Sequence, residues 1–353
     1  MIKYMSLKED VMFDLVYLKS MIHHLFSIDS PSGFTKNATA YLEKEIKELG
    51  YETHYTQSGN LVCTINGMDN IVYGVGAHLD TLGLMVRSIQ DNGKLNFEKI
   101  GGPNLNTLDG EYCRIYTRNN KIYTGTILSK SPSSHVFLDA LTRERNEENM
   151  EIRLDEIVYS KEDTQKLGIE TGDYICIDPK TTITENGFVK SRFIDDKISC
   201  CILMGVLKYL HDNQIIPYHT FKFIFSTYEE VGHGSSYIEK DIVQFLAVDM
   251  GCIGLDLSCT EQDVSICAKD SSGPYDYDMV SNLIELSKKN QLSYAVDIYP
   301  KYSSDASAAQ RGGNNIRTAL IGPGVHASHG MERCHMDGIL NTMKLLYAYM
   351  IQK

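Results

Sequence analysis

Two adjacent glutamates close an apolar strand, and this feature most restricts how the chain can fold. Residues 221–225 alternate aromatic side chains with others, which predicts a buried strand. Glu229 and Glu230 follow it, before Gly232 and Gly234 interrupt the pattern. A carboxylate pair at the exit of a core strand is costly unless positive charge lies nearby. Alternatively, one glutamate faces solvent and the other caps a helix that begins at Ser235.

Further metal-type ligands stand at the ends of other apolar segments or in the adjoining turns. They are His78 with Asp80, Asp195 with Asp196, Asp249, and His329 with Glu332. One such residue is usually structural. Five such places in a single chain indicate a shared cluster of imidazoles and carboxylates, the ligand set that suits two zinc ions or similar metals.

The strongest strand signal precedes His78. Residues 71–77 form a nearly continuous apolar run, as expected for a central buried strand. Ligands bind at the carboxyl ends of strands in open α/β sheets. In extended chain, His78 and Asp80 point to the same side, so the histidine can bind a metal while the aspartate orients its other ring nitrogen. Asp195 and Asp196 precede an apolar helix at 198–210, and a helix cap explains one of them but not both.

The pattern of apolar residues changes between residues 87 and 179. Helical periodicity is weak there, and short β-like segments recur at 94–99, 112–117, 121–128, 151–159 and 173–178. We therefore predict a small β-rich domain, residues 87–179, inserted into an α/β domain made of residues 1–86 and 180–353. Helices are expected at 7–26 and 337–352. His135 lies in the insert and receives no role.

Composition excludes several classes of protein. The chain has 353 residues and a net charge of −12, with no Lys/Arg-rich run, so we expect no nucleic-acid partner. No apolar run reaches 18 residues, so we expect no membrane span, and the first residues do not resemble a signal peptide. Nine cysteines without a C-x-x-C pair are typical of reduced thiols in a cytoplasmic protein.

The ordered set of motifs resembles the M42 peptidases, a family of metallo-aminopeptidases with glutamyl-aminopeptidase and tetrahedral members. The resemblance covers nearly the whole length and includes glycine positions in the insert. Its motifs are His78-Leu-Asp80, Asp195-Asp196-Lys197, Tyr228-Glu229-Glu230-Val-Gly, Asp249 and His329. It implies an α/β fold with a mixed-sheet, three-layer, zinc-exopeptidase-like catalytic domain. The inserted domain would be a small, barrel-like dimerisation domain.

The resemblance also implies a metal centre with two divalent ions per chain. Zinc is favoured, with cobalt or manganese as alternatives. Asp195 would bridge the two ions. His78 and Asp249 would complete one site, and Glu230 and His329 the other.

Two further residues would serve catalysis. Glu229 would act as the general base that takes a proton from the attacking water and passes it to the leaving amine. Asp80 would hold His78 in orientation. His326 and His335 remain competitors for the role given to His329.

The chain departs from the family pattern at three places. Thr81 stands where most relatives have Glu, Lys197 where many have Arg, and Gly330 where many have Ser. The chain therefore resembles a divergent branch, members of which are associated with the metabolism of osmoprotectant dipeptides.

These features give three hypotheses of function. The first is a dinuclear aminopeptidase that acts on short peptides. The second is a metal-dependent deacylase or amidase that acts on N-acylated amino acids or a capped dipeptide. The third is a non-enzymatic binding protein with a relict site. The presence of every expected ligand type argues against this third hypothesis. The insert predicts a homo-oligomer, at least a dimer and potentially a dodecamer.

Overall fold

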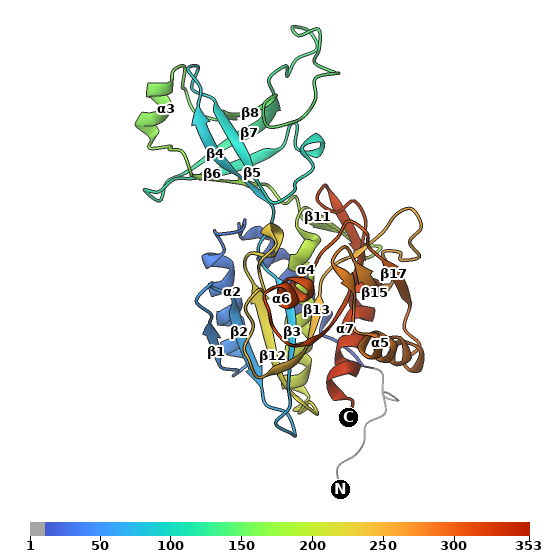
Figure 1. Ribbon diagram of the computed structural model, residues 1–353. Helices are drawn as coiled ribbons and strands as arrows, with labels where there is room; N and C mark the ends of the chain where they lie inside the picture. The colour runs from blue at the N-terminus through green and yellow to red at the C-terminus, as the bar shows by residue number, and fades with distance from the viewer. Residues whose placement is uncertain (1–10) are drawn as a thin grey trace.

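The computed structural model describes residues 11–353, and its centre is a ten-stranded mixed sheet (Figure 1). Eight strands follow the order β1-β2-β12-β3-β13-β18-β15-β16, while β14 pairs with β18 and β17 pairs with β15. The strands are β1 (Thr53–Tyr55), β2 (Leu61–Ile65), β3 (Val72–His78), β12 (Thr220–Ser226), β13 (Ile242–Val248), β14 (Gly251–Cys252), β15 (Val264–Asp270), β16 (Gly273–Pro274), β17 (Tyr294–Ile298) and β18 (Arg317–Val325).

Three parallel strands at the centre of the sheet have their C-terminal ends on the same side of the sheet. β3 lies between β12 and β13 and runs parallel to both. Ser226 pairs with His78, and Ala247 pairs with Gly76, so the three strands finish almost level. Whatever follows each strand is therefore brought to one place, as the apolar runs predicted.

Helices cover the sheet because their apolar faces need a partner. The helices are α1 (Leu15–Ser27), α2 (Lys36–Glu48), α4 (Ile194–Asp212), α5 (Tyr277–Lys289), α6 (Asp305–Arg311) and α7 (Met336–Ile351). The long α4 packs between α1 and α7 and lies against β3, and its interior-facing residues from Ile198 to Leu207 are buried. Figure 1 shows α6 in front of the sheet and α4 behind it, which gives the three-layer arrangement.

The inserted segment forms a closed antiparallel barrel in the order β4-β5-β8-β7-β6-β9. Its elements are β4 (Gly83–Ile89), β5 (Leu95–Ile100), η1 (Leu105–Thr107), β6 (Tyr112–Tyr116), β7 (Ile122–Ser129), β8 (Met150–Leu154), α3 (Lys161–Leu167) and β9 (Tyr174–Ile177). The barrel has its own apolar core and stands beyond the carboxyl edge of the central sheet (Figure 1). The predicted α/β fold with an inserted barrel is confirmed.

Polar contacts fix the barrel to the larger domain. Arg114 of β6 donates two 2.7 Å hydrogen bonds to the two carboxylate oxygens of Asp29, just after α1. Arg192 is buried and donates to the Thr107 carbonyl at 2.6 Å. A three-stranded sheet of β10 (Thr182–Ile183), β11 (Phe188–Ser191) and β19 (Glu332–His335) lies beside this junction. The bidentate contact of Arg114 with Asp29 restricts the orientation of the two domains as well as their distance.

Several local predictions differ from the structure. The first helix begins at Leu15, and residues 7–10 of the predicted range lie outside the described part of the chain. No helix begins at Ser235, because residues 232–241 form turns, so the capping alternative for the glutamate pair is wrong. α3, α6, β15 and β19 were not predicted. Among residues 11–353, no helix is both long enough and apolar enough to cross a membrane.

Candidate metal centre

His78 occupies the last position of β3 with its ring fully buried. A ring nitrogen facing a carbonyl must carry the proton, and Nδ1 lies 2.9 Å from the Asp80 carbonyl oxygen. Nε2 is therefore left as the free ligand atom, and it lies 3.0 Å from Asp195 Oδ1. The predicted pairing of His78 with Asp80 exists, but the backbone makes the close contact. The Asp80 carboxylate lies 3.7 Å from Nδ1.

His329 is oriented in the same manner by the linker after the first barrel strands. Its Nδ1 lies 2.9 Å from the Gly102 carbonyl oxygen, two residues after β5. Its Nε2 points to the same aspartate as His78 and lies 3.5 Å from Asp195 Oδ2 and 3.7 Å from Glu230 Oε2. Backbone carbonyls that hold Nδ1 are a common way to fix the tautomer of a metal-binding histidine.

Asp195 stands between the two imidazoles, with one carboxylate oxygen toward each. Its position at the start of α4 is held by Glu332, which accepts hydrogen bonds from the Asp195 amide at 3.0 Å and from the His329 amide at 2.9 Å. Glu332 therefore ties together the two ends of the cluster. The sequence placed Glu332 beside His329 among the metal-type ligands, but its contact with the Asp195 amide was not predicted, because that contact joins residues 137 positions apart.

Glu229 and Glu230 form a short turn after β12, η2 (Glu229–Val231). The turn is held by Asp80, whose carboxylate accepts from the Glu229 amide at 3.1 Å and the Glu230 amide at 3.2 Å. Ser32 donates a third hydrogen bond to Asp80 at 2.5 Å. The Asp80 carboxylate therefore holds the turn that carries the glutamate pair, while it also lies 3.7 Å from His78 Nδ1. Glu229 Oε2 lies 3.7 Å from His78 Nε2.

Two groups of three residues could each hold an ion, because within each group the ligand atoms all lie within 4.8 Å of one another. One consists of His78, Asp195 and Glu230, and the other of His78, Asp196 and Asp249. Asp249 directly follows β13, and its Oδ1 accepts from the Met250 amide at 2.6 Å. Asp196 received no ligand role from the sequence, and its Oδ2 accepts from the His78 amide at 3.2 Å.

The concentration of acids perturbs the ionisation of the metal-free cluster. Burial raises the pKa of Glu229 well above its usual range, with Asp249 adding to the effect. Burial also raises the pKa of Asp249 to about 7, and Asp195 contributes. Burial opposes a charge on His329, yet Asp195 and Glu230 raise its pKa to about 10. Burial and mutual repulsion therefore disfavour the simultaneous ionisation of these carboxyl groups unless positive charge is added.

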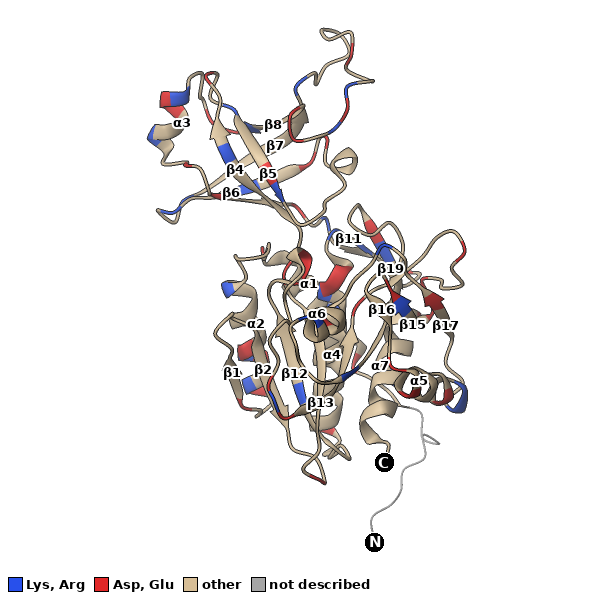
Figure 2. Cartoon of the chain, viewed as in Figure 1, with Lys and Arg blue, Asp and Glu red and all other residues tan. Residues whose placement is uncertain are grey.

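The donor set fits divalent cations. Glu230 Oε1 and Asp196 Oδ1 are buried and have no hydrogen-bond partner within residues 11–353. Lys197, which follows Asp196 in the sequence, makes no ion pair with the cluster, because its Nζ donates to the Leu25 and Ile28 carbonyls at the end of α1. Buried carboxylate oxygens without donors are the expected condition of metal ligands when no ion is present. Figure 2 shows acidic segments at the sheet edge that faces the barrel.

All seven residues to which the resemblance assigned a role lie in or beside this cluster. They are His78, Asp80, Asp195, Glu229, Glu230, Asp249 and His329. The two competing histidines lie elsewhere. His335 Nε2 contacts the Asn186 carbonyl oxygen at 2.7 Å, and its Nδ1 accepts from the Asp337 amide at the start of α7. His326 has an exposed side chain and pairs through its backbone with Arg333, and His135 is exposed in the loop between β7 and β8.

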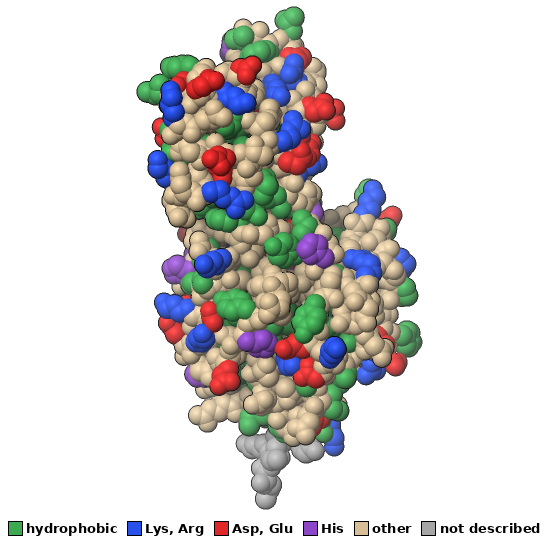
Figure 3. Space-filling model, turned by 60° about the vertical axis from the view of Figure 1, so that its left-hand side comes forward, with side chains coloured by type: hydrophobic (Ala, Val, Ile, Leu, Met, Phe, Trp, Pro, Cys, Tyr) green, Lys and Arg blue, Asp and Glu red, His purple; other side chains and the backbone are tan. Residues whose placement is uncertain are grey.

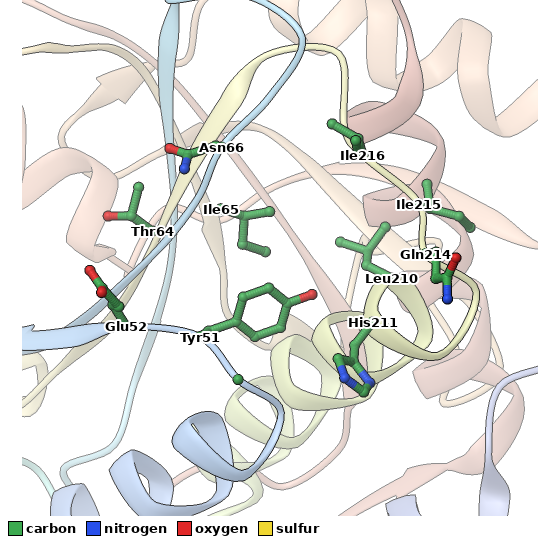
Figure 4. Close-up of a pocket in the computed structure, with 11 residues that line it drawn as sticks. Tyr51, Glu52, Thr64, Ile65, Asn66, Leu210, His211, Gln214, Ile215 and Ile216 are labelled. Atoms are coloured by element: carbon green, nitrogen blue, oxygen red, sulfur yellow. The ribbon is translucent and has the colours of Figure 1, made fainter. Parts of the chain in front are cut away.

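A separate pocket lies near the beginning of β12, at the end of the sheet away from the acidic cluster (Figure 4). Tyr51, Ile65, Leu210 and His211 are among its lining residues, and its volume is about 560 Å³. Ile65 pairs with Phe221 at the beginning of β12, whereas the acidic cluster follows the end of that strand. The pocket is therefore remote from the candidate metal centre.

Comparison with known proteins agrees with this geometry. The model of the M42 glutamyl aminopeptidase family matches residues 59–345. A Bacillus subtilis (strain 168) protein with the name "Putative aminopeptidase YhfE" is 46% identical over 331 residues, which cover 93% of this chain and 96% of that protein. The lysyl aminopeptidase of Pyrococcus furiosus is 24% identical over 322 residues, covering 86% and 88% of the two chains.

Solved structures share the fold. A TET aminopeptidase from the marine sediment archaeon Thaumarchaeota archaeon SCGC AB-539-E09 has a TM-score of 0.86 at 19% identity, covering 95% of this chain and 97% of that chain. The TET1 peptidase of Pyrococcus horikoshii has a TM-score of 0.83 at 22% identity, covering 95% and 100%.

The fold and the family match together define a metallo-hydrolase. The chain belongs to the M42 glutamyl aminopeptidase family, whose aminopeptidases remove N-terminal residues from peptides. Membership of this family makes the protein a metal-dependent enzyme.

Proposed function

We propose that the protein is a dinuclear aminopeptidase that removes N-terminal residues from short peptides. The observation that carries the proposal is the position of Asp195 between two imidazoles. Its Oδ1 lies 3.0 Å from His78 Nε2, and its Oδ2 lies 3.5 Å from His329 Nε2. A carboxylate that offers one oxygen to each side is suited to bridge two cations.

His78 and Asp249 would hold one divalent ion, Glu230 and His329 the other, and Asp195 both. All are imidazole or carboxylate ligands, which favour zinc and also admit cobalt and manganese. Such ions supply Lewis-acid polarisation of the scissile carbonyl and lower the pKa of a water molecule to near neutrality. One of the two metal ions would also bind the free N-terminal amine of a peptide, which would account for exopeptidase selectivity.

Glu229 would be the general base. Its carboxylate lies 3.7 Å from His78 Nε2. Glu229 belongs to neither of the two groups of close ligand atoms described above. It would accept the proton of the attacking water and return it to the leaving amine. Asp80 would keep Glu229 in place by holding the turn through the backbone amides.

The test is the variant Glu229→Gln, which preserves size and removes the base. Turnover of aminoacyl-nitroanilides should fall by about 10²- to 10⁴-fold or more. The metal content should remain near that of the unchanged protein. Glu98→Gln on the barrel, where Glu98 pairs with Arg87 at 3.8 Å, is the matched control and should leave turnover unchanged. Normal activity in the Glu229 variant would show that another group is the base.

The second candidate changes the bond that is cleaved. Thr81 and Gly330, the two departures from the family pattern that flank the cluster, favour a deacylase or amidase for N-acylated amino acids or a capped dipeptide. A panel of free and N-acetylated dipeptides separates the two reactions. Hydrolysis restricted to blocked amines would replace the aminopeptidase proposal, whereas hydrolysis restricted to free amines would remove the second candidate.

We also propose that the barrel, the predicted dimerisation domain of residues 87–179, mediates self-association. The loop between β7 and β8 exposes Val136, Leu138 and Leu141, which are 73%, 109% and 87% exposed. Figure 3 shows hydrophobic side chains at the outer end of the barrel. An apolar group exposed to this extent is typical of an interaction surface. The TET1 peptidase of Pyrococcus horikoshii assembles into a tetrahedron or an octahedral shell, which supports a second copy of this chain as the partner.

Light scattering after size-exclusion chromatography tests this assignment. The unchanged protein should be a dimer or a larger closed assembly, and Leu138→Asp should shift it toward the monomer because a charge would be buried at the interface. Leu255→Asp, at a leucine that is 95% exposed on the catalytic domain, is the control and should leave the assembly intact. A monomeric unchanged protein would contradict the proposal.

A further inference from the structure

The buried Arg192 connects the barrel linker, residues 101–111 between β5 and β6, with the turn that carries His329. Arg192 follows β11, and only 3% of its surface is exposed. Its Nη1 donates to the Gly330 carbonyl at 3.2 Å and to the Thr107 hydroxyl at 3.1 Å. Its Nη2 donates to the Thr107 carbonyl at 2.6 Å. One guanidinium group therefore holds two segments that belong to different domains.

The turn that carries His329, residues 327–330, has a backbone conformation that needs external support. Ala327 and His329 have φ values of 62° and 61°, in the left-handed region that residues with a Cβ rarely adopt. Within the turn, the Gly330 amide donates to the Ala327 carbonyl at 3.1 Å. Residues in such a conformation persist where the surrounding structure holds them. Contacts from outside the turn therefore decide where the imidazole points.

The barrel linker provides several of these outside contacts. The Gly102 carbonyl oxygen lies 2.9 Å from His329 Nδ1, and the Asn104 amide donates to the His329 carbonyl at 2.9 Å. Thr107 donates to the Asn104 carbonyl through its amide at 2.9 Å and through its hydroxyl at 2.8 Å. The segment that orients the imidazole is therefore the same segment that Arg192 binds.

The ionic contact of Arg192 is incomplete. Glu111 Oε1 lies 3.5 Å from Nη2, and the other carboxylate oxygen of Glu111 lies 2.6 Å from Lys180 Nζ. Arg192 Nε is buried and has no hydrogen-bond partner within residues 11–353. A buried ion pair with incomplete hydrogen bonding is weak evidence for stability. The planar guanidinium instead fixes the relative position of its acceptors, because its donors have a rigid geometry.

We propose that Arg192 is a positioning residue for His329. The guanidinium holds the turn against the barrel linker, so that His329 Nε2 stays 3.5 Å from Asp195 Oδ2 and 3.7 Å from Glu230 Oε2. Arg192 would thereby support the cation that His329 and Glu230 hold. The other cation has ligands at the ends of β3 and β13, with which Arg192 makes no described hydrogen bond. This inference rests on the proposed function, because it assigns a support to one of the two ions.

The consequence is a selective weakening of one metal site. Arg192→Lys keeps the positive charge but does not reproduce the rigid fork that holds the Thr107 and Gly330 carbonyls together. Groups that orient metal ligands typically contribute 10- to 100-fold in metal affinity. The dissociation constant of one ion should therefore rise by about 10- to 100-fold in Arg192→Lys, while that of the other ion stays unchanged.

The experiment is equilibrium dialysis of the chelator-treated protein against zinc and against cobalt, followed by metal analysis. Arg114→Lys is the matched control, because Arg114 also links the barrel to the catalytic domain, through Asp29, and makes no described contact with the turn. This control should bind both ions as the unchanged protein does. Thermal unfolding in chelator establishes that each variant is folded. If Arg192→Lys does not fold, Thr107→Val, which removes one acceptor of the guanidinium, takes its place with the same expected direction.

A double variant identifies the affected ion. His329→Gln removes the imidazole and should abolish binding of the ion that His329 would hold. Arg192→Lys should then have no further effect on metal affinity in the His329→Gln background, because the group that it positions is already absent.

The outcomes separate this inference from the proposed function. An unchanged protein that binds no divalent ion overturns both. Two ions bound with equal affinity by the unchanged protein and by Arg192→Lys overturn the positioning role alone. Equal weakening in Arg192→Lys and Arg114→Lys also overturns it, because any loosening of the domain junction would then have the same effect. A further loss of affinity in the His329→Gln background overturns it as well. Weakening of one ion in Arg192→Lys, absent from Arg114→Lys and from the His329→Gln background, supports it.

Discussion

The Asp80 carboxylate offers a sharp test of how the glutamate pair is held. Asp80 is fully buried, its Oδ1 accepts from the Glu229 amide at 3.1 Å, and its Oδ2 accepts from the Glu230 amide at 3.2 Å. Asp80→Asn keeps the shape of the side chain but replaces one acceptor by an NH2 donor. In either orientation of the amide, one backbone N–H then faces a donor and loses its partner.

The magnitude follows from that one lost contact. A hydrogen bond to a charged group contributes about 1.5–3 kcal/mol, so Asp80→Asn should lower the free energy of unfolding by roughly 2 kcal/mol. The turn that carries both glutamates must also shift to relieve the donor–donor contact. A displacement near 1 Å in catalytic groups costs about 10²-fold in rate, so kcat should fall by that order.

Asp297 provides a matched control at a distance from the metal centre. It is also buried, and its two carboxylate oxygens accept from the Ser258 amide at 2.8 Å and the Cys259 amide at 3.0 Å. Asp297→Asn should therefore cost a similar amount of stability and leave kcat unchanged. Thermal unfolding and steady-state kinetics on the same preparations give both quantities. If Asp80→Asn lost stability like Asp297→Asn but kept its kcat, the carboxylate would not position the catalytic turn.

Two further predictions concern packing and metal at the same turn. In Gly234→Ala the added carbon would lie 2.6 Å from Asp305 Oδ1 and 2.8 Å from the Glu229 amide, so we expect about 1–3 kcal/mol of destabilisation and a loss of activity. Gly254→Ala has open space and serves as its control, so equal thermal shifts in the two variants would refute the packing argument. Removal of metal with a chelator should lower the unfolding temperature, because the buried carboxylates then lack a counter-charge, and zinc, cobalt or manganese should restore it. An unfolding temperature that ignores both chelator and metal would contradict the cation fit.

The sequence predicted the location of the cluster because it is set by strand direction. His78, Glu229 and Asp249 each follow an apolar run, and parallel neighbours bring the ends of such runs to one edge. The structure adds the register, which pairs Ser226 with His78. The weak helical periodicity and the recurring short β-like segments of the insert likewise predicted a β-rich domain.

The supports of the cluster could not be predicted in the same way. The contacts of Glu332 with two amides and of Asp80 with the glutamate turn depend on approaches between distant segments, for which one sequence has no periodic signal. α6 has seven residues, too few for helical periodicity to be distinctive. β19 is a strand because it pairs with β11, and its own four residues do not alternate clearly in burial.

The hydrogen bond between His329 and the Gly102 carbonyl links the inserted domain to the candidate metal centre. One imidazole of the candidate metal centre is oriented by a peptide group that belongs to the inserted barrel. A shortened enzyme with residues 87–179 excised would leave that ring free to rotate, even if the rest of the sheet folded normally. A tilt of the barrel would therefore reach His329 both through the Gly102 carbonyl and through the Asn104 amide, which donates to the His329 carbonyl at 2.9 Å.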